Sequence, residues 1–188
     1  ISKFHPENER IKRKYFSHLK EAKGLSYKTI TEIKKSLSRF EEFTKFKDLK
    51  NFSPKQASEF KRWFAGSKSK ITGDNISKSS LLSTINHLKD FFIWLSTNKG
   101  YKKISFPDIQ YFNLSENDKR TAKAGKPRDF ASLEQIKMVI EKMPANNEIE
   151  KRNKAILCFL ILTGTRVSAL ISLKLKHIDL EKGFVNQD

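Results

Sequence analysis

The segment "ILTGTRVSALISL", residues 161–173, places an arginine between two apolar stretches. The apolar run of residues 155–162 predicts a helix that enters a hydrophobic core. Gly164 and its two threonine neighbours interrupt that run, and apolar residues resume at helical spacing after Arg166. The segment therefore predicts two helices joined at an elbow, with Arg166 at the elbow. We expect the elbow to be partly enclosed, so that the planar guanidinium needs a carboxylate or a phosphate as partner. A solvated arginine, or one paired at the surface, is the alternative that the residues leave open.

The composition indicates a basic protein with real hydrophobic cores. The chain has 188 residues with 37% hydrophobic content, which is sufficient for one medium domain or two small ones. Its 38 Lys and Arg exceed its 21 Asp and Glu, so the formal net charge is +17. Such a charge favours a polyanionic partner, most commonly nucleic acid. A solvated lysine-rich surface explains the same charge without a partner.

Several function classes find no support in the sequence. Cys158 is the only cysteine, which excludes an internal disulfide and fits a reducing compartment. The four histidines are scattered without metal-ligand spacing, and no glycine-rich phosphate loop occurs, so we expect no metal and no cofactor. No apolar run is long enough to cross a membrane, and no signal peptide precedes the first helix, so we expect a cytoplasmic protein. Because the chain begins at Ile1 and stops at "GFVNQD", which reads as an unfinished strand, we expect it to be a fragment.

The first hundred residues predict a small helical bundle. A helix is expected from Pro6 to just before Gly24, and an amphipathic one after Ser26. Ser53 with Pro54 predicts the start of a third helix, which ends at Gly66. Residues 78–95 carry the longest apolar stripe. Four helices of this kind are typical of a bundle.

Periodicity fails after residue 98 and returns near residue 130. Two glycines and two prolines fall in that stretch, together with the basic run "ENDKRTAKAGKPRD". We therefore expect one domain over residues 1–112, a linker over residues 113–129 and the start of a second domain over residues 130–188. In the second domain, a capping box at Ser132 predicts a helix that Pro144 ends, two further helices follow, and "FV" at residues 184–185 predicts a strand.

The elbow segment also resembles a known family. "LTGTRVSALISLKLKHID" is similar to the Thr-Gly-x-Arg-x-Ser-Glu-Leu-x-x-Leu segment of tyrosine recombinases, the phage integrase family. The upstream helices resemble the family's core-binding domain, and "KPRDFASLEQIKMVIEKMP" resembles the start of its catalytic domain. The resemblance implies a mainly α fold, in which a SAM-like four-helix core-binding domain precedes the helical start of a truncated α+β catalytic domain. Ala169 departs from the pattern, because the family usually has there an acidic residue that supports the active site.

The resemblance implies a specific chemistry. Family members cut duplex DNA with a tyrosine nucleophile through a 3′-phosphotyrosyl intermediate, without metal or cofactor, and commonly as a tetramer on two duplexes. Arg166 matches the first catalytic arginine, and the other catalytic residues are expected beyond Asp188. Every tyrosine of the chain precedes Arg166, so none stands where the nucleophile should; they are Tyr15, Tyr27, Tyr101 and Tyr111. We therefore expect the fragment to bind double-stranded DNA without cleaving it.

Basic and hydroxyl side chains on two helices are the candidate DNA contacts, because such residues at helix starts suit phosphates. The set comprises Lys28, Thr31, Lys34 and Lys35 on the second helix and Lys78, Ser79, Ser80, Ser83, Asn86 and Lys89 on the fourth. A solvated helix face is the alternative for each member. The expected linker adds basic residues that either cross the DNA or form a solvated tether, namely Lys119, Arg120, Lys123, Lys126 and Arg128.

Two other functions remain open from the residues. "CFLILTGTRVSALISLKLKH" also fits a helix-turn-helix regulator with Gly164 in the turn, although its second helix carries few side chains that could read base edges. A basic RNA-binding or ribosome-associated protein is the other alternative, and it rests on the charge alone. A competition between duplex DNA and single-stranded RNA separates the RNA-binding alternative from the other two.

Overall fold

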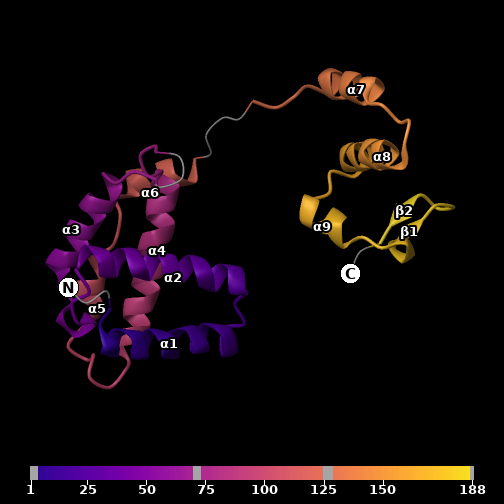
Figure 1. The fold of residues 1–188 in the computed structure, drawn as a ribbon. Coiled ribbons are helices and arrows are strands. Elements are labelled where there is room, and N and C mark those ends of the chain that lie inside the picture. The colour runs from indigo at the N-terminus through magenta and orange to yellow at the C-terminus, as the bar shows by residue number, and fades with distance from the viewer. Residues whose placement is uncertain (1–3, 70–72, 125–128, 187–188) are drawn as a thin grey trace. The chain divides into compact units, whose positions relative to one another are not determined.

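The chain folds into two compact units, residues 1–126 and residues 127–188 (Figure 1). The computed structural model describes residues 4–69, 73–124 and 129–186. Both units are built mainly from helices, so the expected mainly α fold is confirmed. No described helix is long and apolar enough to cross a membrane.

The first unit contains each of the helices expected before residue 100. They are α1 (Pro6–Glu21), α2 (Tyr27–Phe43), α3 (Pro54–Ala65) and α4 (Lys78–Ser96), with the short 3-10 helix η1 (Leu49–Asn51) between α2 and α3. Local sequence explains where they begin. Ser26, Ser53 and Ser77 each accept a hydrogen bond from a backbone N–H of the first turn, which satisfies an otherwise unpaired donor. The sequence therefore predicted these helices through caps and apolar spacing.

Aromatic rings form the centre of this unit. The Phe40 ring on α2 lies 5.3 Å from that of Phe60 on α3 and 5.4 Å from that of Phe92 on α4, as ring-centroid distances. Phe112 completes the cluster at 5.8 Å from Phe40. These edge-on contacts bury large apolar areas and add the attraction between ring edges and faces. Helices α3 and α4 and the segment after residue 110 thus pack on a single side chain of α2.

A buried polar network attaches α1 to the bundle. The Asn8 amide donates to Glu41 Oε1 at 3.2 Å and to the Lys47 carbonyl at 3.0 Å, and its oxygen accepts the Leu49 N–H at 3.1 Å. Lys12 forms an ion pair with Glu41 on α2 and another with Glu9. Because Asn8, Lys12 and Glu41 are buried, each polar group depends on its partner.

The expected linker is shorter in the structure. The sequence placed residues 116–123 in the expected linker, but they form α6 (Glu116–Lys123), which packs on α4. The short helix α5 (Phe106–Gln110) precedes α6 and was also not expected. Ser115 caps α6, and acidic residues in the first turn with basic residues in the last complement the helix dipole. The cap and the charge pattern are visible in the sequence, but this run has no apolar stripe. Hydrophobic periodicity therefore does not reveal the helix. Lys126 and Arg128 lie outside the described residues.

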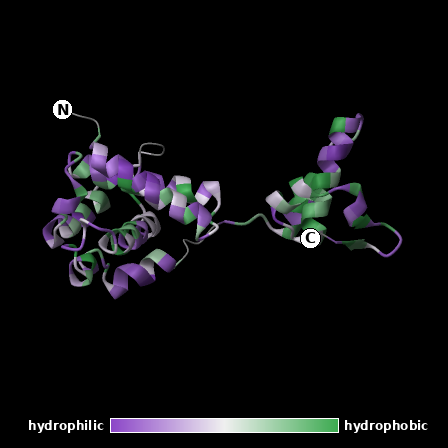
Figure 2. Ribbon diagram, turned by 90° about the horizontal axis from the view of Figure 1, so that it is seen from below, coloured by the Kyte–Doolittle hydropathy of each residue, from purple (hydrophilic) through white to green (hydrophobic). Residues whose placement is uncertain are grey.

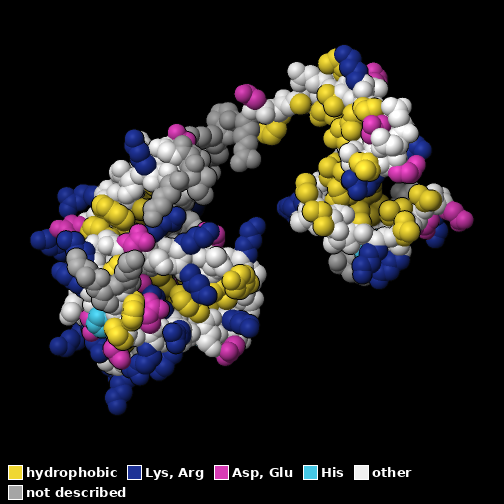
Figure 3. All heavy atoms as spheres, viewed as in Figure 1, with side chains coloured by type: hydrophobic (Ala, Val, Ile, Leu, Met, Phe, Trp, Pro, Cys, Tyr) yellow, Lys and Arg dark blue, Asp and Glu magenta, His cyan; other side chains and the backbone are white. Residues whose placement is uncertain are grey.

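The second unit contains three α-helices, a 3-10 helix and a small hairpin in its described part. They are α7 (Leu133–Lys142), α8 (Glu148–Thr163), α9 (Val167–Ser172), the 3-10 helix η2 (Leu175–His177), and the strands β1 (Ile178–Asp179) and β2 (Phe184–Val185). The strands pair antiparallel, with Ile178 opposite Val185. None of the described side chains of this unit is buried. Much of its chain is hydrophobic (Figure 2), and hydrophobic side chains are visible on its surface (Figure 3).

The network around Asn8 yields a stability prediction. Asn8→Ala should lower the free energy of unfolding by about 2 kcal/mol, because it leaves the buried Leu49 N–H without its acceptor and weakens the setting of Glu41. Ser17→Ala, an exposed change on the same helix, should alter it by less than about 0.5 kcal/mol. Urea unfolding followed by tryptophan fluorescence tests this, since both tryptophans, Trp63 and Trp94, lie in the first unit. Equal effects of the two substitutions would contradict the prediction.

Candidate nucleic-acid interface

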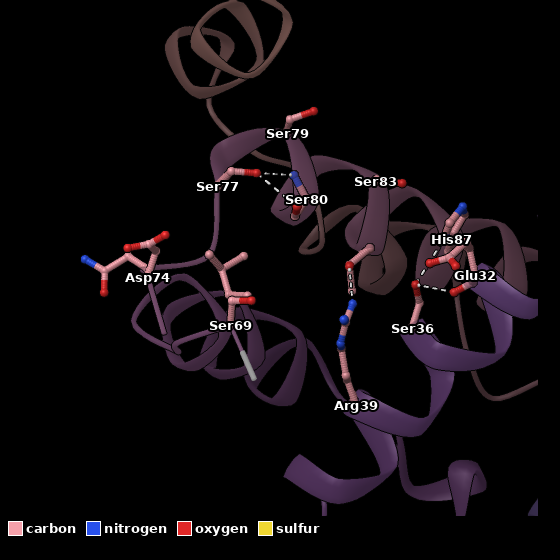
Figure 4. A pocket seen from close by; sticks show the side chains of 13 residues that line it. Glu32, Ser36, Arg39, Ser69, Asp74, Ser77, Ser79, Ser80, Ser83 and His87 are labelled. Atoms are coloured by element: carbon pink, nitrogen blue, oxygen red, sulfur yellow. Dashed lines mark hydrogen bonds between the residues drawn. The ribbon is translucent and has the colours of Figure 1, made fainter. Parts of the chain in front are cut away.

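A groove of about 850 Å³ lies between α2 and α4 in the first unit, and it is lined mainly by hydroxyl side chains (Figure 4). We call it the α2–α4 groove. The residues used below are Glu32, Ser36 and Arg39 from α2 and Ser79, Ser80, Ser83, Thr84 and His87 from α4. A surface that carries many hydroxyl donors and a guanidinium is suited to the oxygens of phosphate groups.

A second hollow of about 570 Å³ adjoins the groove on the side of α3. We call it the α2–α3 hollow. Its apolar part includes Trp63 and Phe64, and its basic part includes Lys34, Lys35 and Lys68. Arg39, Ser69 and Ile76 line both cavities, so the two form one continuous depression with Arg39 at the junction.

The expected DNA contacts on α2 lie along this depression. Thr31, Lys34 and Lys35 line the α2–α3 hollow, and Lys28 is exposed one turn earlier. Two of these lysines already have partners within the protein. Lys35 forms an ion pair of 2.7 Å with Glu32, and the Lys34 ammonium lies 5.1 Å from the centre of the Phe16 ring. Their charge is therefore partly engaged.

The expected contacts on α4 are divided between two flanks of the helix. Ser79, Ser80 and Ser83 line the α2–α4 groove. Lys78 and Lys89 instead contact the segment that follows α5, where Lys78 binds Asp118 at 2.9 Å and Lys89 donates to the Asn113 side chain at 2.7 Å; Asn86 is exposed. The structure therefore does not bring Lys78 and Lys89 together with the serines.

The set expected from the sequence missed several groove residues, among them Arg39 and His87, whose guanidinium and imidazole groups each contact the facing helix of the α2–α4 pair. The Arg39 Nη1 donates to Thr84 Oγ1 at 3.3 Å, and the guanidinium carbon lies 5.2 Å from the centre of the Phe64 ring. His87 Nδ1 lies 2.9 Å from the Ser36 hydroxyl (Figure 4). A periodic signal existed for Arg39, since it follows Lys35 by four residues on the same side of α2. His87 follows Ser83 in the same way on α4.

The hydrogen bonds around His87 indicate its tautomer. The Ser36 hydroxyl donates to the Glu32 carbonyl at 3.1 Å, so its oxygen is left to accept from His87 Nδ1. Burial lowers the pKa of His87 below its usual value, against the opposing effect of Asp90 and Glu32. The hydrogen bond from Lys35 holds the pKa of Glu32 below its usual range, so Glu32 remains a carboxylate. At neutral pH the groove therefore holds a neutral imidazole and a lysine-paired carboxylate.

The elbow at Arg166 is formed as expected, but it is not enclosed by the described residues. Gly164 ends α8 in the left-handed conformation, at φ +61°, and Arg166 is the N-cap residue of α9. Arg166 is exposed, and so are Leu162 at 85% and Val167 at 61%. Within the described part of the chain, the Arg166 side chain has neither a hydrogen bond nor an ion pair. The expectation that the elbow is enclosed is therefore wrong for the described residues. Among them, none packs over the apolar side chains beside Arg166.

The four tyrosines belong to the first unit. Tyr15 and Tyr101 are buried, and burial raises the pKa of both hydroxyls, which makes them poorer nucleophiles. Tyr27 and Tyr111 are exposed. Their positions agree with roles in the core and at the surface.

Comparison with known proteins identifies the family of both units. Residues 13–99 match the phage integrase N-terminal SAM-like domain, and residues 130–187 match the phage integrase family. The chain belongs to the phage integrase family, the tyrosine recombinases. The α2–α4 groove therefore lies in the SAM-like domain, and Arg166 lies in the integrase domain.

Curated relatives of this integrase-family chain are tyrosine recombinases. It is 25% identical to tyrosine recombinase XerC of Lactobacillus delbrueckii subsp. bulgaricus over 181 residues, covering 93% of the chain and 55% of the relative. It is 28% identical to XerC of Bacillus licheniformis over 167 residues, with coverages of 88% and 50%. XerD of Oceanobacillus iheyensis is 26% identical over 185 residues, with coverages of 91% and 53%. The chain thus spans about half the length of these relatives. No solved structure matches it significantly.

The buried His87 predicts an acid-dependent loss of stability. Its pKa is lower in the folded than in the unfolded state, so the unfolded chain binds the proton more readily as the pH falls below about 6.5. The free energy of unfolding should therefore decrease between about pH 7.5 and pH 5, and His87→Gln should lose less of it over that interval. Urea unfolding at the two pH values measures the difference within each variant.

Asn86→Gln is the matched control, since Asn86 is the exposed neighbour of His87 on α4. It should keep the pH dependence of the wild type. If His87→Gln also keeps that dependence, the imidazole is not the group responsible.

Proposed function

We propose that the protein acts in site-specific DNA recombination as a tyrosine recombinase, and that its first unit binds double-stranded DNA through the α2–α4 groove and the α2–α3 hollow. The observation that carries this proposal is the order of the two matched domains, with the Thr-Gly-x-Arg elbow of Arg166 in the second. The net charge of +17 supports a polyanionic substrate. Lysine and arginine side chains cover much of the visible face of the first unit (Figure 3).

Arg166 has a defined role in the proposed reaction. In a protein with a complete catalytic domain, its guanidinium binds non-bridging oxygens of the scissile phosphate. A tyrosine hydroxyl attacks the phosphorus, the 5′ oxygen leaves with a proton, and the 3′ phosphate becomes esterified to the tyrosine. Arg166 stabilises the negative charge that increases on the phosphate oxygens during this transfer. The phosphotyrosyl ester conserves the energy of the broken bond, so rejoining needs no further energy source.

A recombinase of this kind joins two duplexes. We propose that the complete protein works as a homotetramer on two duplexes, in the cytoplasm, where a bacterial cell keeps its DNA. The exposed apolar side chains of the second unit are suited to further protein contacts.

The helix-turn-helix alternative finds less support. α9, which would be the recognition helix, has only six residues, and its polar side chains are Ser168 and Ser172. Base readout in the major groove needs several long hydrogen-bonding side chains on one helix. We therefore assign the elbow to phosphate chemistry rather than to sequence readout.

One prediction of the proposed function concerns the 188 residues themselves. They should bind duplex DNA more tightly than single-stranded RNA of equal length, with an affinity that falls steeply with salt, and they should leave a nicked suicide substrate uncut. Fluorescence anisotropy with both competitors measures binding, and a denaturing gel measures covalent complex. Preference for RNA would exclude the proposal, and a covalent DNA adduct would show that one of the chain's own tyrosines reacts.

The second prediction concerns Arg166 in the complete protein. Arg166→Ala should reduce the rate of phosphotyrosyl formation by at least about 100-fold, because a preorganised charge on the transition state is lost. DNA affinity should change less than about threefold, since one phosphate contact among many is removed. Arg152→Ala, which removes an exposed arginine from the preceding helix, should retain the wild-type rate. Weaker binding with a normal rate in the bound fraction would make Arg166 a positioning residue instead.

A further inference from the structure

Arg39 occupies a singular place in the first unit. It lines both the α2–α4 groove and the α2–α3 hollow. In the α2–α4 groove, it is the arginine among the described lining residues (Figure 4). Its side chain is only partly exposed, and it extends from α2 toward Thr84 on α4. Any extended polyanion that follows the depression from one cavity to the other passes this side chain.

Two contacts fix the direction of the guanidinium. One N–H donates to the Thr84 hydroxyl at 3.3 Å, and the guanidinium carbon lies 5.2 Å from the centre of the Phe64 ring. Thr84 and Phe64 are both buried, so these supports are themselves held by the core. A guanidinium offers five donors, so this arrangement orients the group while using few of them. Less side-chain entropy is then lost when a ligand binds.

Carboxylates line the two cavities beside Arg39, namely Glu32, Glu42 and Asp74. The hydrogen bond from Lys35 and, to a smaller extent, the charge of Arg39 lower the pKa of Glu32. Among the described residues, none of the ion pairs includes Arg39. The neighbouring carboxylate of Glu32 is bound by Lys35 at 2.7 Å. Among the lysines expected to contact DNA, Lys78 is paired with Asp118, whereas Lys28 is exposed. Arg39 is thus a partly buried and oriented cation that forms no ion pair within the described part of the chain.

Hydroxyl groups complete the surroundings of Arg39. Ser79 and Ser83 line the same groove, and within the described chain no hydrogen bond uses their hydroxyls. A guanidinium with nearby hydroxyl donors matches the non-bridging oxygens of a phosphate diester. We propose that Arg39 binds a backbone phosphate of duplex DNA in the α2–α4 groove, an inference that rests on the proposed DNA-binding function.

The test compares the salt dependence of DNA binding between variants of the 188-residue chain. Each neutralised phosphate contributes about −0.9 to the slope of log affinity against log salt concentration. Arg39→Ala should make the slope less negative by about 0.9 and weaken binding about tenfold at low salt. The loss should be equal on two duplexes of unrelated sequence, because a phosphate contact carries no sequence information.

Two further variants separate charge from orientation. Arg39→Lys keeps the charge but not the fork of donors, so it should restore the slope while binding more weakly than the wild type. Thr84→Val removes the orienting hydrogen bond with the volume preserved, so it should weaken binding without changing the slope. Arg62→Ala is the matched control, because Arg62 is an exposed arginine on α3 that lines neither cavity. It should change the slope less than Arg39→Ala does.

Each outcome has a distinct meaning. If Arg39→Ala retains the wild-type slope while the chain still binds duplex DNA, the phosphate contact is refuted and the proposed function stands. A loss confined to one DNA sequence would also refute it, in favour of base readout. If the wild-type chain shows no salt-dependent binding to duplex DNA, the proposed function itself fails. Tryptophan fluorescence establishes that each variant is folded, and Arg39→Lys preserves the test if Arg39→Ala is unfolded.

Discussion

The packing around the Phe40 ring is the constraint on which the first unit depends. The centre of that ring lies 5.3 to 5.8 Å from the ring centres of Phe60 on α3, Phe92 on α4 and Phe112. Because of these contacts, the helices cannot shift independently. Arg39 precedes Phe40 on α2, so the residue that centres the core also determines where the guanidinium lies. The shape of the α2–α4 groove is therefore a consequence of core packing. A binding surface built this way keeps its geometry without needing the ligand to organise it.

The basic residues of the first unit have different roles despite their similar charge. Lys12 is buried in an ion pair with Glu41 and holds α1, and Lys78 binds Asp118 and holds α6. Lys28, in contrast, is exposed, and Arg39 is oriented by neutral groups. Net charge raises the local concentration of a polyanion and speeds its approach. The site at which the polyanion then binds is determined by the basic side chains that are not already paired within the protein.

Local signals made most of the fold predictable, and tertiary contacts account for the rest. Caps and apolar spacing are properties of neighbouring residues. The sequence alone therefore predicted where the helices before residue 100 begin, and it also showed the resemblance at the elbow. α6 has no apolar stripe, and it is held by contacts with α4 that are distant in sequence. The same applies to the site: Ser83 and Lys89 lie on one helix, but only packing decides that the first faces α2 and the second faces Asn113.

The two units differ in how far their described residues complete a site. The groove in the first unit rests on a buried core, whereas Arg166 stands at an elbow whose apolar neighbours are exposed. The interaction of a guanidinium with a phosphate is weak in water and strengthens several-fold as solvent is excluded. In the proposed reaction, Arg166 therefore stabilises the transition state effectively only when other groups, from protein or DNA, cover the elbow. The proposed DNA binding and the proposed DNA cleavage consequently make separate demands on this sequence. The first depends on the Phe40 core, and the second depends on the enclosure of Arg166.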